Sequence, residues 1–337
     1  MTSKTFKGSG AVLIGLAVLL AGCSQPAQKP QGPALTRIRF ATDWHAQAEQ
    51  GGFYEALATG EYQKRGLDVS IIEGGPAVNV PQLLASGAVD MGIGSNSFIV
   101  LNLAQEHAPV SAVAAFMQKD PQVLMAHPDQ GIKSFSDMKG RPILISDAAI
   151  TSFWPWLRAK FGFKDAQIRK YTHSNATFLA DPRAIQEGYL TSEPYTIEKE
   201  GHLKPAVFLL ADAGYPGYAA MAMATNSLIK SNPTAVKAFV DASAAGWHAY
   251  LYGDPKPADA LIMKDNPDMT QDVLDQARAK MREKGLVDGG DAKTGGIGVM
   301  SDARWAEAFG FAAKADIYPK SMDYKAGYTL QFLGPTK

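Results

Sequence analysis

The sequence predicts an α/β fold whose last third is helical, and three observations support this. Strand-like runs alternate with helical stretches from Thr36 onward, which is the pattern of βαβ units and a mostly parallel sheet. After about Pro233 only helical patterns follow, separated by Asp, Asn, Pro and Gly. The length of 337 residues, with 46% hydrophobic residues, suits two globular domains or one large one.

The first predicted elements alternate between strand and helix. TRIRFA at Thr36 to Ala41 has the pattern of a strand, and Gly51 to Thr59 has helical spacing with a glycine near its end. Asn79 to Ala85 is predicted as a helix because Pro81 lies in its first turn, where the missing N–H costs nothing. The other elements expected here are strands at Val69 to Ile72 and Ala88 to Ile93 and a helix from Ser97 to Ala104.

A second α/β round begins near Gln122 to Ala126. It continues through a strand at Pro142 to Ser146 and a helix near Phe153 to Lys160, and it closes with a strand at Val207 to Ala211. The helical last third is predicted at Pro233 to Leu251, Pro257 to Lys264, Gln271 to Glu283 and Asp302 to Ala315.

The N-terminus has the order of a lipoprotein signal. Lys4 and Lys7 precede an apolar run from Ala11 to Leu20, which is too short to span a bilayer as a helix. Leu20-Ala21-Gly22-Cys23 follows, and Cys23 is the only cysteine of the chain. We therefore expect a signal peptide at 1–22, lipidation of Cys23 and a Pro- and Gln-rich tether at 23–35. This predicts an exported protein, in the periplasm or on the cell membrane, anchored by its lipid.

Composition excludes two classes of function. The chain has 33 Lys+Arg and 33 Asp+Glu, so it lacks the basic field with which nucleic-acid-binding proteins attract phosphates. Beyond the N-terminus no long uncharged apolar run occurs, which excludes a polytopic membrane protein. We expect no nucleic-acid partner and a monomer.

Short motifs occur along the chain between about Thr36 and about Ala245. They are Thr42-Asp43-Trp44, Gly51 to Ala56, Glu61 to Val69, Gln82 to Gly87, Val89 to Ile93, Met138 to Pro142 and Gly188 to Pro194. These motifs resemble those of solute-binding proteins of ABC importers, and the closest group binds alkanesulfonates, nitrate-like anions or the pyrimidine precursor of thiamine.

The resemblance implies a two-lobed periplasmic-binding-protein fold of type II that closes on a small-molecule ligand. Lobe one would comprise residues 36–117 and 218–337, and lobe two residues 118–217. It also implies an ABC permease and its ATPase as partners. The single cysteine and the spacing of the histidines lead us to expect no cofactor and no metal.

Ligands of open α/β sheets bind beyond the carboxyl ends of strands, and this rule selects candidate residues. Asp43 and Trp44 follow the first strand, and an indole beside a carboxylate suits a planar ligand with hydrogen-bond donors. The resemblance adds Glu193 at a late position of the cleft. The full set of candidates is Asp43, Trp44, Glu49, Phe53, Gly75, Asn79, Ser95, Asn96, Ser97, Asp147, Thr151, Trp154, Trp156, Glu193 and Tyr195.

Core packing, helix capping or a solvated turn is the alternative interpretation for several of these residues. Trp44 and the pair Trp154 and Trp156 also suit a core, and Ser95 to Ser97 also suit a helix N-cap.

The charges of the candidates favour a particular ligand class. Asp43, Glu49, Asp147 and Glu193 are acidic, against Lys119 and His45 near the presumed cleft, and none of the candidates is an arginine. Carboxylates raise the cost of binding an anion, so a planar heteroaromatic with ring or amino donors, such as a thiamine pyrimidine precursor, is the better match. The stretch His45 to Gln50 departs from the Pro-Asn-His that such binders commonly have. Alkanesulfonates, taurine and nitrate remain the alternative.

Two alternative functions are an enzyme and a ligand-sensing lipoprotein. An enzyme is disfavoured because the six histidines fall in no metal-binding spacing and no Gly-x-Ser-x-Gly nucleophile elbow occurs. Gly295-Gly296-Ile297-Gly298 lacks the Lys-Ser/Thr of a phosphate-binding loop. A lipoprotein that senses a ligand would use the same fold, and sequence does not separate sensing from import.

Overall fold

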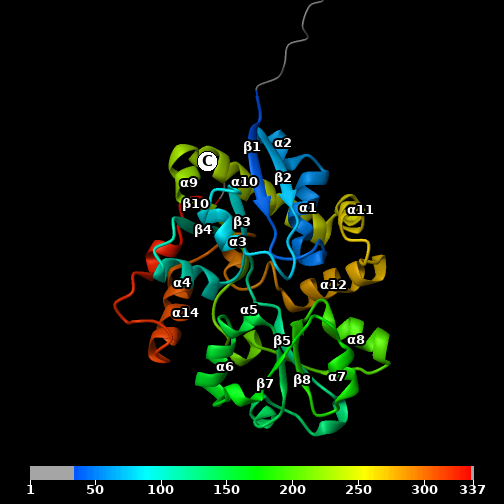
Figure 1. The fold of residues 1–337 in the computed structure, drawn as a ribbon. Coiled ribbons are helices and arrows are strands. Elements are labelled where there is room, and N and C mark those ends of the chain that lie inside the picture. The colour runs from blue at the N-terminus through cyan, green and yellow to red at the C-terminus, as the bar shows by residue number, and fades with distance from the viewer. Residues whose placement is uncertain (1–33, 335–337) are drawn as a thin grey trace, which may run out of the picture. The chain divides into compact units, whose positions relative to one another are not determined.

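The structure is a computed structural model that describes residues 34–334, and residues 35–334 form one compact unit with two five-stranded sheets (Figure 1). The signal peptide, Cys23 and the tether were predicted in residues that lie outside this range. We call the first sheet with its helices lobe 1, and the second sheet with its helices lobe 2.

The sheet of lobe 1 has the strand order β2-β1-β3-β10-β4. β1 pairs in parallel with β2 and β3, whereas β10 runs antiparallel to β3 and β4. Its strands are β1 (Thr36–Ala41), β2 (Leu67–Ile72), β3 (Met91–Asn96), β4 (Val110–Met117) and β10 (Ala219–Thr225).

The sheet of lobe 2 has the order β7-β6-β8-β5-β9. β6 pairs in parallel with β7 and β8, and β5 runs antiparallel to β8 and β9. Its strands are β5 (Gln122–Ala126), β6 (Ile143–Ile145), β7 (Ile168–Lys170), β8 (Ile185–Tyr189) and β9 (Ala206–Leu209).

The expectation of a mostly parallel sheet is wrong in detail, because each sheet has as many antiparallel as parallel pairings. The cause is the connection between the lobes. β5 and β10 are the strands that the chain enters after it crosses from the other lobe, and these two run against their neighbours.

Arg304 contacts both segments in which the chain crosses between the lobes, the one between β4 and β5 and the one between β9 and β10. Arg304 donates from Nη2 to the carbonyl oxygen of Gln118 and, at 2.6 Å, to that of Gly217. Its guanidinium also lies 4.3 Å from the ring centroid of Tyr218, a cation–π contact. The two passages between the lobes are thereby tied to one side chain of the helical C-terminal part.

Helices surround both sheets. Those of lobe 1 are α1 (Gly51–Ala58), α2 (Glu61–Lys64), α3 (Val80–Ala85), α4 (Ser97–Gln105), α9 (Asn226–Ser231), α10 (Pro233–Tyr252), α11 (Lys256–Asp265), α12 (Gln271–Lys284), α13 (Ala292–Gly295) and α14 (Asp302–Lys314). Those of lobe 2 are α5 (Asp147–Ile150), α6 (Trp154–Phe161), α7 (Ala176–Ala180) and α8 (Glu193–Gly201). Short 3₁₀ helices occupy Ala48–Gln50, Pro128–Gln130, Phe135–Met138, Asp165–Gln167, Ala211–Ala213 and Tyr324–Gly327. None of the helices in this described part of the chain is long and apolar enough to span a membrane.

The core of lobe 1 depends on a close approach of α1 to α10. A Cβ atom on Gly52 would lie 2.1 Å from Cγ of Trp247, and one on Gly246 would lie 2.2 Å from the carbonyl oxygen of Gly52. Both positions therefore require glycine. The contact buries Trp247 and Phe53 completely, next to Phe40 and Phe239.

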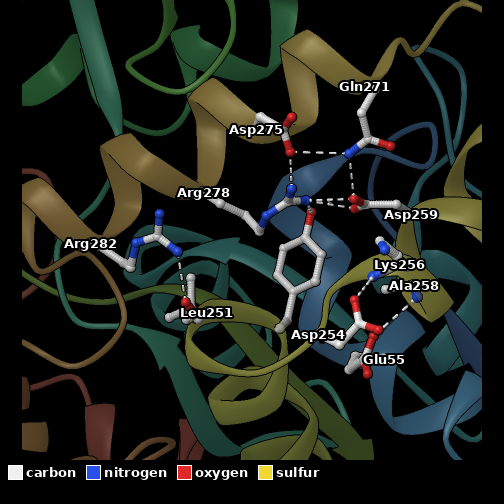
Figure 2. A network of polar contacts seen from close by, with 11 residues as sticks. Glu55, Leu251, Asp254, Lys256, Ala258, Asp259, Gln271, Asp275, Arg278 and Arg282 are labelled. Carbon is white, nitrogen blue, oxygen red and sulfur yellow. Dashed lines mark hydrogen bonds and ion pairs between the residues drawn. The ribbon is translucent and has the colours of Figure 1, made fainter.

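A buried polar network fixes α12 against α11 (Figure 2). Arg278 is 5% exposed and donates from Nη1 to both carboxylate oxygens of Asp259, at 2.7 and 2.8 Å. Gln271 donates to Asp259 at 2.7 Å and to Asp275 at 3.0 Å, and Asp275 also accepts from Arg278. α12 is thus held in place on the side of lobe 1 that faces α8 of lobe 2.

Candidate ligand-binding site

Side chains from both lobes meet at the carboxyl ends of β1 and β8, and we call this region the interlobe junction. Trp44, which follows β1, contacts the His173 ring from lobe 2 with 4.6 Å between ring centroids. Glu49 accepts a hydrogen bond from the hydroxyl of Thr191, just after β8. The segments that follow β1, β7 and β8 are therefore in direct contact, and ligands of α/β folds bind beyond the carboxyl ends of strands such as these.

The turn after β1 is held by hydrogen bonds of Thr42. Its hydroxyl donates to the carbonyl oxygen of Trp44 at 2.8 Å and accepts from the N–H of Gly74 at 2.9 Å. A Cβ atom on Gly74 would lie 2.3 Å from the carbonyl oxygen of Thr42, so only glycine allows this approach. The turn fixes Asp43 and Trp44 at the junction.

Three of the predicted carboxylates lie together here. Asp43 accepts from the hydroxyl of Ser95 at 2.6 Å, and Glu193 accepts from the N–H of Tyr189 at 2.7 Å. Electrostatic repulsion from Asp43 and Glu193 acts on Glu49, which is 4% exposed. The predicted acidic residues Asp43, Glu49 and Glu193 are therefore brought together, from both lobes.

Burial makes these carboxylates resist ionisation. It raises the pKa of Glu49 to about 7, because desolvation and the neighbouring carboxylates outweigh the hydrogen bond from Thr191. Burial also raises the pKa of Asp43 and of Glu193. No ion pair reaches any of the three from another described residue. The junction therefore presents hydrogen-bond acceptors that lack a positive partner.

The structure adds acidic residues that the sequence did not indicate. Glu187 of β8 is 5% exposed, its Oε2 atom has no hydrogen-bond partner among the described residues, and burial raises its pKa to about 8. Asp120, in the first crossing segment, is 4% exposed and has its pKa raised to about 7 by burial. Asp120, Glu49 and Glu193 all act electrostatically on the hydroxyl of Tyr189. No local sequence pattern indicates that a carboxylate inside a strand or in a connecting segment belongs to a site. These two residues are therefore found only from the fold.

An aromatic wall accompanies the carboxylates. The ring centroid of His173 lies 4.6 Å from that of Trp44 and 5.0 Å from that of Tyr171. Burial lowers the pKa of His173, which favours the neutral imidazole. Tyr171 and His173 follow β7, whose strand was not predicted, and so they were missed as well.

Three predicted aromatic residues lie in the core instead. Trp154 is 1% exposed, and its indole N–H donates to Asp165 at 2.9 Å. Trp156 is 0% exposed and packs against Tyr215, and Phe53 is equally buried in lobe 1. Core packing was the alternative interpretation for Trp154 and Trp156, whereas Phe53 is buried because α1 packs it against Trp247 of α10. We leave all three out of the proposed site.

The other predicted residues cap helices, bond backbone groups or lie at the surface. Asn96 caps α4 by accepting from the N–H groups of Phe98 and Ile99, and Asn79 caps α3 by accepting from that of Gln82. Ser97 bonds the backbone of Tyr218, with its hydroxyl accepting at 2.8 Å. Gly75 adjoins the ring of His45, Asp147 forms an exposed ion pair with Lys170, Thr151 is exposed, and Tyr195 bonds Asp272.

The fold is that of periplasmic substrate-binding proteins. The aliphatic sulphonate-binding protein of Escherichia coli superimposes with a TM-score of 0.67 at 15% identity, over 90% of this chain and 96% of that one. Within that class, a family model described as NMT1/THI5 like matches residues 47–258, and the chain belongs to this family.

Relatives in sequence have two kinds of function. The formylaminopyrimidine-binding protein of Halalkalibacterium halodurans is 24% identical over 278 residues, which cover 80% of this chain and 78% of that one. The 4-amino-5-hydroxymethyl-2-methylpyrimidine phosphate synthase of Schizosaccharomyces pombe is 29% identical over 107 residues, 32% of this chain and 31% of the synthase. The match to the binding protein therefore extends over most of both chains, and the match to the synthase over about a third of each.

Proposed function

We propose that this chain is the lipid-anchored solute-binding component of an ABC importer and binds a small planar heteroaromatic, such as a thiamine pyrimidine precursor. The observation that carries the proposal is the convergence of Asp43, Glu49 and Glu193, from both lobes, beside Trp44. Carboxylates that have no cationic partner suit a ligand that brings hydrogen-bond donors, and an indole offers a flat surface for its ring.

An aminopyrimidine meets both requirements. Its amino group donates hydrogen bonds, and its planar ring stacks on an aromatic face. The relative that is named a formylaminopyrimidine-binding protein supports this ligand class. A sulfonate or nitrate would have to approach several carboxylates that form no ion pair with a described cation, which raises its cost of binding.

Binding would exchange contacts across the junction. The Trp44 ring now packs on His173, and Thr191 bonds Glu49. A planar ligand that enters between the lobes would stack between the rings of Trp44 and His173. Its hydrogen-bond donors would compete with the Thr191 hydroxyl for the carboxylate of Glu49. Because these ligand contacts come from both lobes, they stabilise the closed state over the open one.

Binding rather than catalysis is the proposed role. The extended match to a binding protein supports this, whereas the match to the synthase covers about a third of each chain. Export, the lipid at Cys23 and the importer complex are supported by the signal-like N-terminus and by the binding-protein fold.

A thermal-shift screen of the chain from Ser24 onward tests the ligand class. Aminopyrimidines, thiamine, alkanesulfonates, taurine and nitrate are each added at rising concentration. A ligand at a hundred times its dissociation constant stabilises the folded state by about 2.7 kcal/mol, which is a measurable rise in Tm. We expect aminopyrimidines to raise the Tm. A rise with sulfonates or nitrate alone would contradict the proposed ligand.

Glu193→Gln provides the matching test of the site. Loss of the charge from a hydrogen bond to the ligand weakens binding by about 1.5–3 kcal/mol, or roughly ten- to hundred-fold. Glu198→Gln is the control, because it removes a carboxylate from an exposed position of the same helix. Equal affinities of both variants would remove Glu193 from the site.

A further inference from the structure

A depression lies in lobe 2 near the amino ends of its parallel strands, whereas the interlobe junction lies at the carboxyl ends. It has a volume of about 460 Å³, and its wall includes Arg141, Lys164, Arg169 and Arg183. These residues precede or begin the parallel strands β6, β7 and β8, whereas the junction residues follow the same strands. Strands of three to five residues separate the two regions by roughly 10–17 Å, so the depression is a different place from the proposed ligand site.

The charge of this depression is unbalanced. Four cationic side chains face one carboxylate, that of Asp181, which accepts from the backbone N–H of Arg183 at 2.8 Å. None of the four cations forms an ion pair with another residue in the described range. Other cations of the same lobe are paired, since Arg158 lies 3.4 Å from Asp165 and Lys170 lies 3.0 Å from Asp147.

Neutral groups hold two of the guanidinium groups in place. Arg141 donates to the side-chain and backbone oxygens of Gln130, at 3.1 and 3.2 Å. Arg169 donates to the backbone oxygens of Ala166 and Ile168, at 3.0 and 2.8 Å. These bonds orient the guanidinium groups without neutralising them, and each group keeps further N–H donors.

Hydrogen bonds of a buried glutamine connect two of the segments that line the depression. Gln167 is 7% exposed, and its amide donates to the backbone oxygens of Met138 and Arg141, at 2.9 and 3.1 Å. This side chain joins the loop before β6, which carries Arg141, to the segment between Lys164 and β7, the strand that contains Arg169. The cations are therefore displayed on a fixed frame and not on independent flexible loops.

We propose that this depression is a binding site for a multivalent phosphate-type oxyanion. Guanidinium groups match the oxygens of a phosphate in pairs, and the excess of positive charge in the wall favours an anion with more than one negative charge. The phosphate can belong to a soluble compound or to the headgroups of an anionic membrane, and the test separates these sources.

Isothermal titration of the chain from Ser24 onward with inorganic pyrophosphate tests a soluble source, and co-sedimentation with phosphatidylglycerol vesicles, against phosphatidylcholine vesicles, tests the lipid source. The variant Arg169→Gln/Arg183→Gln should weaken the interaction about ten- to hundred-fold. The control Lys204→Gln/Lys314→Gln removes the same charge from exposed positions outside the depression and should bind as the parent does.

Binding of pyrophosphate or of anionic vesicles supports the proposal when the arginine variant loses it and the lysine control keeps it. Absence of both interactions overturns it, and so does an equal loss in both variants, which would indicate general charge attraction. The aminopyrimidine-induced rise in Tm should be the same in the arginine variant as in the parent chain. Failure of the oxyanion site therefore leaves the proposed ligand site untouched, and the reverse also holds.

Discussion

Trp44 is the residue whose proposed role can be tested most simply. It lies at the end of β1 with its ring against His173 of lobe 2, where a planar ligand would stack. Removing a stacking aromatic side chain costs about 1–3 kcal/mol per ring, so Trp44→Ala should weaken aminopyrimidine binding by one to two orders of magnitude. Trp44→Phe keeps a flat ring and should recover most of the affinity. Unchanged affinity of Trp44→Ala, measured by titration calorimetry, would exclude this stacking role.

Glu49 should make the stability of the ligand-free chain depend on pH. Its pKa is raised from an ordinary 4.5 to about 7 by burial, with Thr191, Asp43 and Glu193 facing it. A carboxyl group with a raised pKa in the folded state binds more protons there than in the unfolded state. Stability is then full below about pH 4.5 and falls as the pH rises through about 7.

The measurement is the free energy of urea unfolding between pH 5 and pH 8. Glu49 alone contributes a decrease of roughly 3 kcal/mol at most over this range, and Glu49→Gln should flatten the slope. Glu187 and Asp120 have raised pKa values as well, so part of the slope remains in the variant. A Glu49→Gln slope identical to that of the parent would show that this carboxyl group ionises without cost.

At single positions the sequence predicts residues near strand ends more readily than buried ones. Asp43 follows β1, as the strand-end rule expects, and it accepts a hydrogen bond from Ser95, which was expected after its strand but lies inside β3. A tryptophan near the start of a helix is compatible with ligand contact and with core packing. Trp154 is buried because of the way α6 packs, and the local sequence pattern does not indicate that packing. Glu187 was missed because it lies inside a strand that was not predicted.

At the scale of elements, α12 depends on one buried ion pair. Arg278 and Asp259 are 5% and 1% exposed, and their side chains bond through both carboxylate oxygens (Figure 2). Arg278→Met leaves Asp259 buried without its partner, and loss of one member of such a pair costs about 3–5 kcal/mol. We therefore expect a large drop in the urea midpoint.

The control for this prediction is Lys280→Met, which changes a partly exposed residue of the same helix. An exposed ion pair contributes about 0–1 kcal/mol, so this variant should unfold almost as the parent does. Equal stability of the two variants would mean that Asp259 is satisfied by Gln271 alone.

Some helix and strand boundaries agree with the sequence pattern and others do not. The helices α10 and α12 begin and end within a residue or two of their predicted ranges, because Pro, Asn and Gly mark their ends. β3 was expected at Ala88 to Ile93 but lies at Met91–Asn96. β10, with the sequence AAMAMAT, was not predicted because alanine and methionine do not favour strands; its burial between β3 and β4 decides its conformation.

At the scale of the whole described unit, contacts of α12 with α8 and with Thr191 also connect the two lobes. The hydroxyl of Tyr195 donates to Asp272 at 2.6 Å, and Nζ of Lys199 lies 2.9 Å from the same carboxylate. Gln276, one turn further along α12, donates to the carbonyl oxygen of Thr191. Two lobes that touch through polar groups at an exposed edge can separate at low cost, because water replaces these bonds readily.

Asp272→Asn should therefore shift the chain toward an open state. The change removes the ion pair with Lys199 and weakens the bond from Tyr195, while the core of each lobe stays intact. If only the closed state holds the ligand tightly, the apparent dissociation constant rises in proportion as the closed fraction falls. We expect a larger radius of gyration in small-angle scattering without ligand, weaker aminopyrimidine binding and an unchanged unfolding midpoint. Asp268→Asn, an exposed carboxylate before α12, should change none of these quantities. A variant that kept the radius but lost affinity would instead place Asp272 among the groups that contact the ligand.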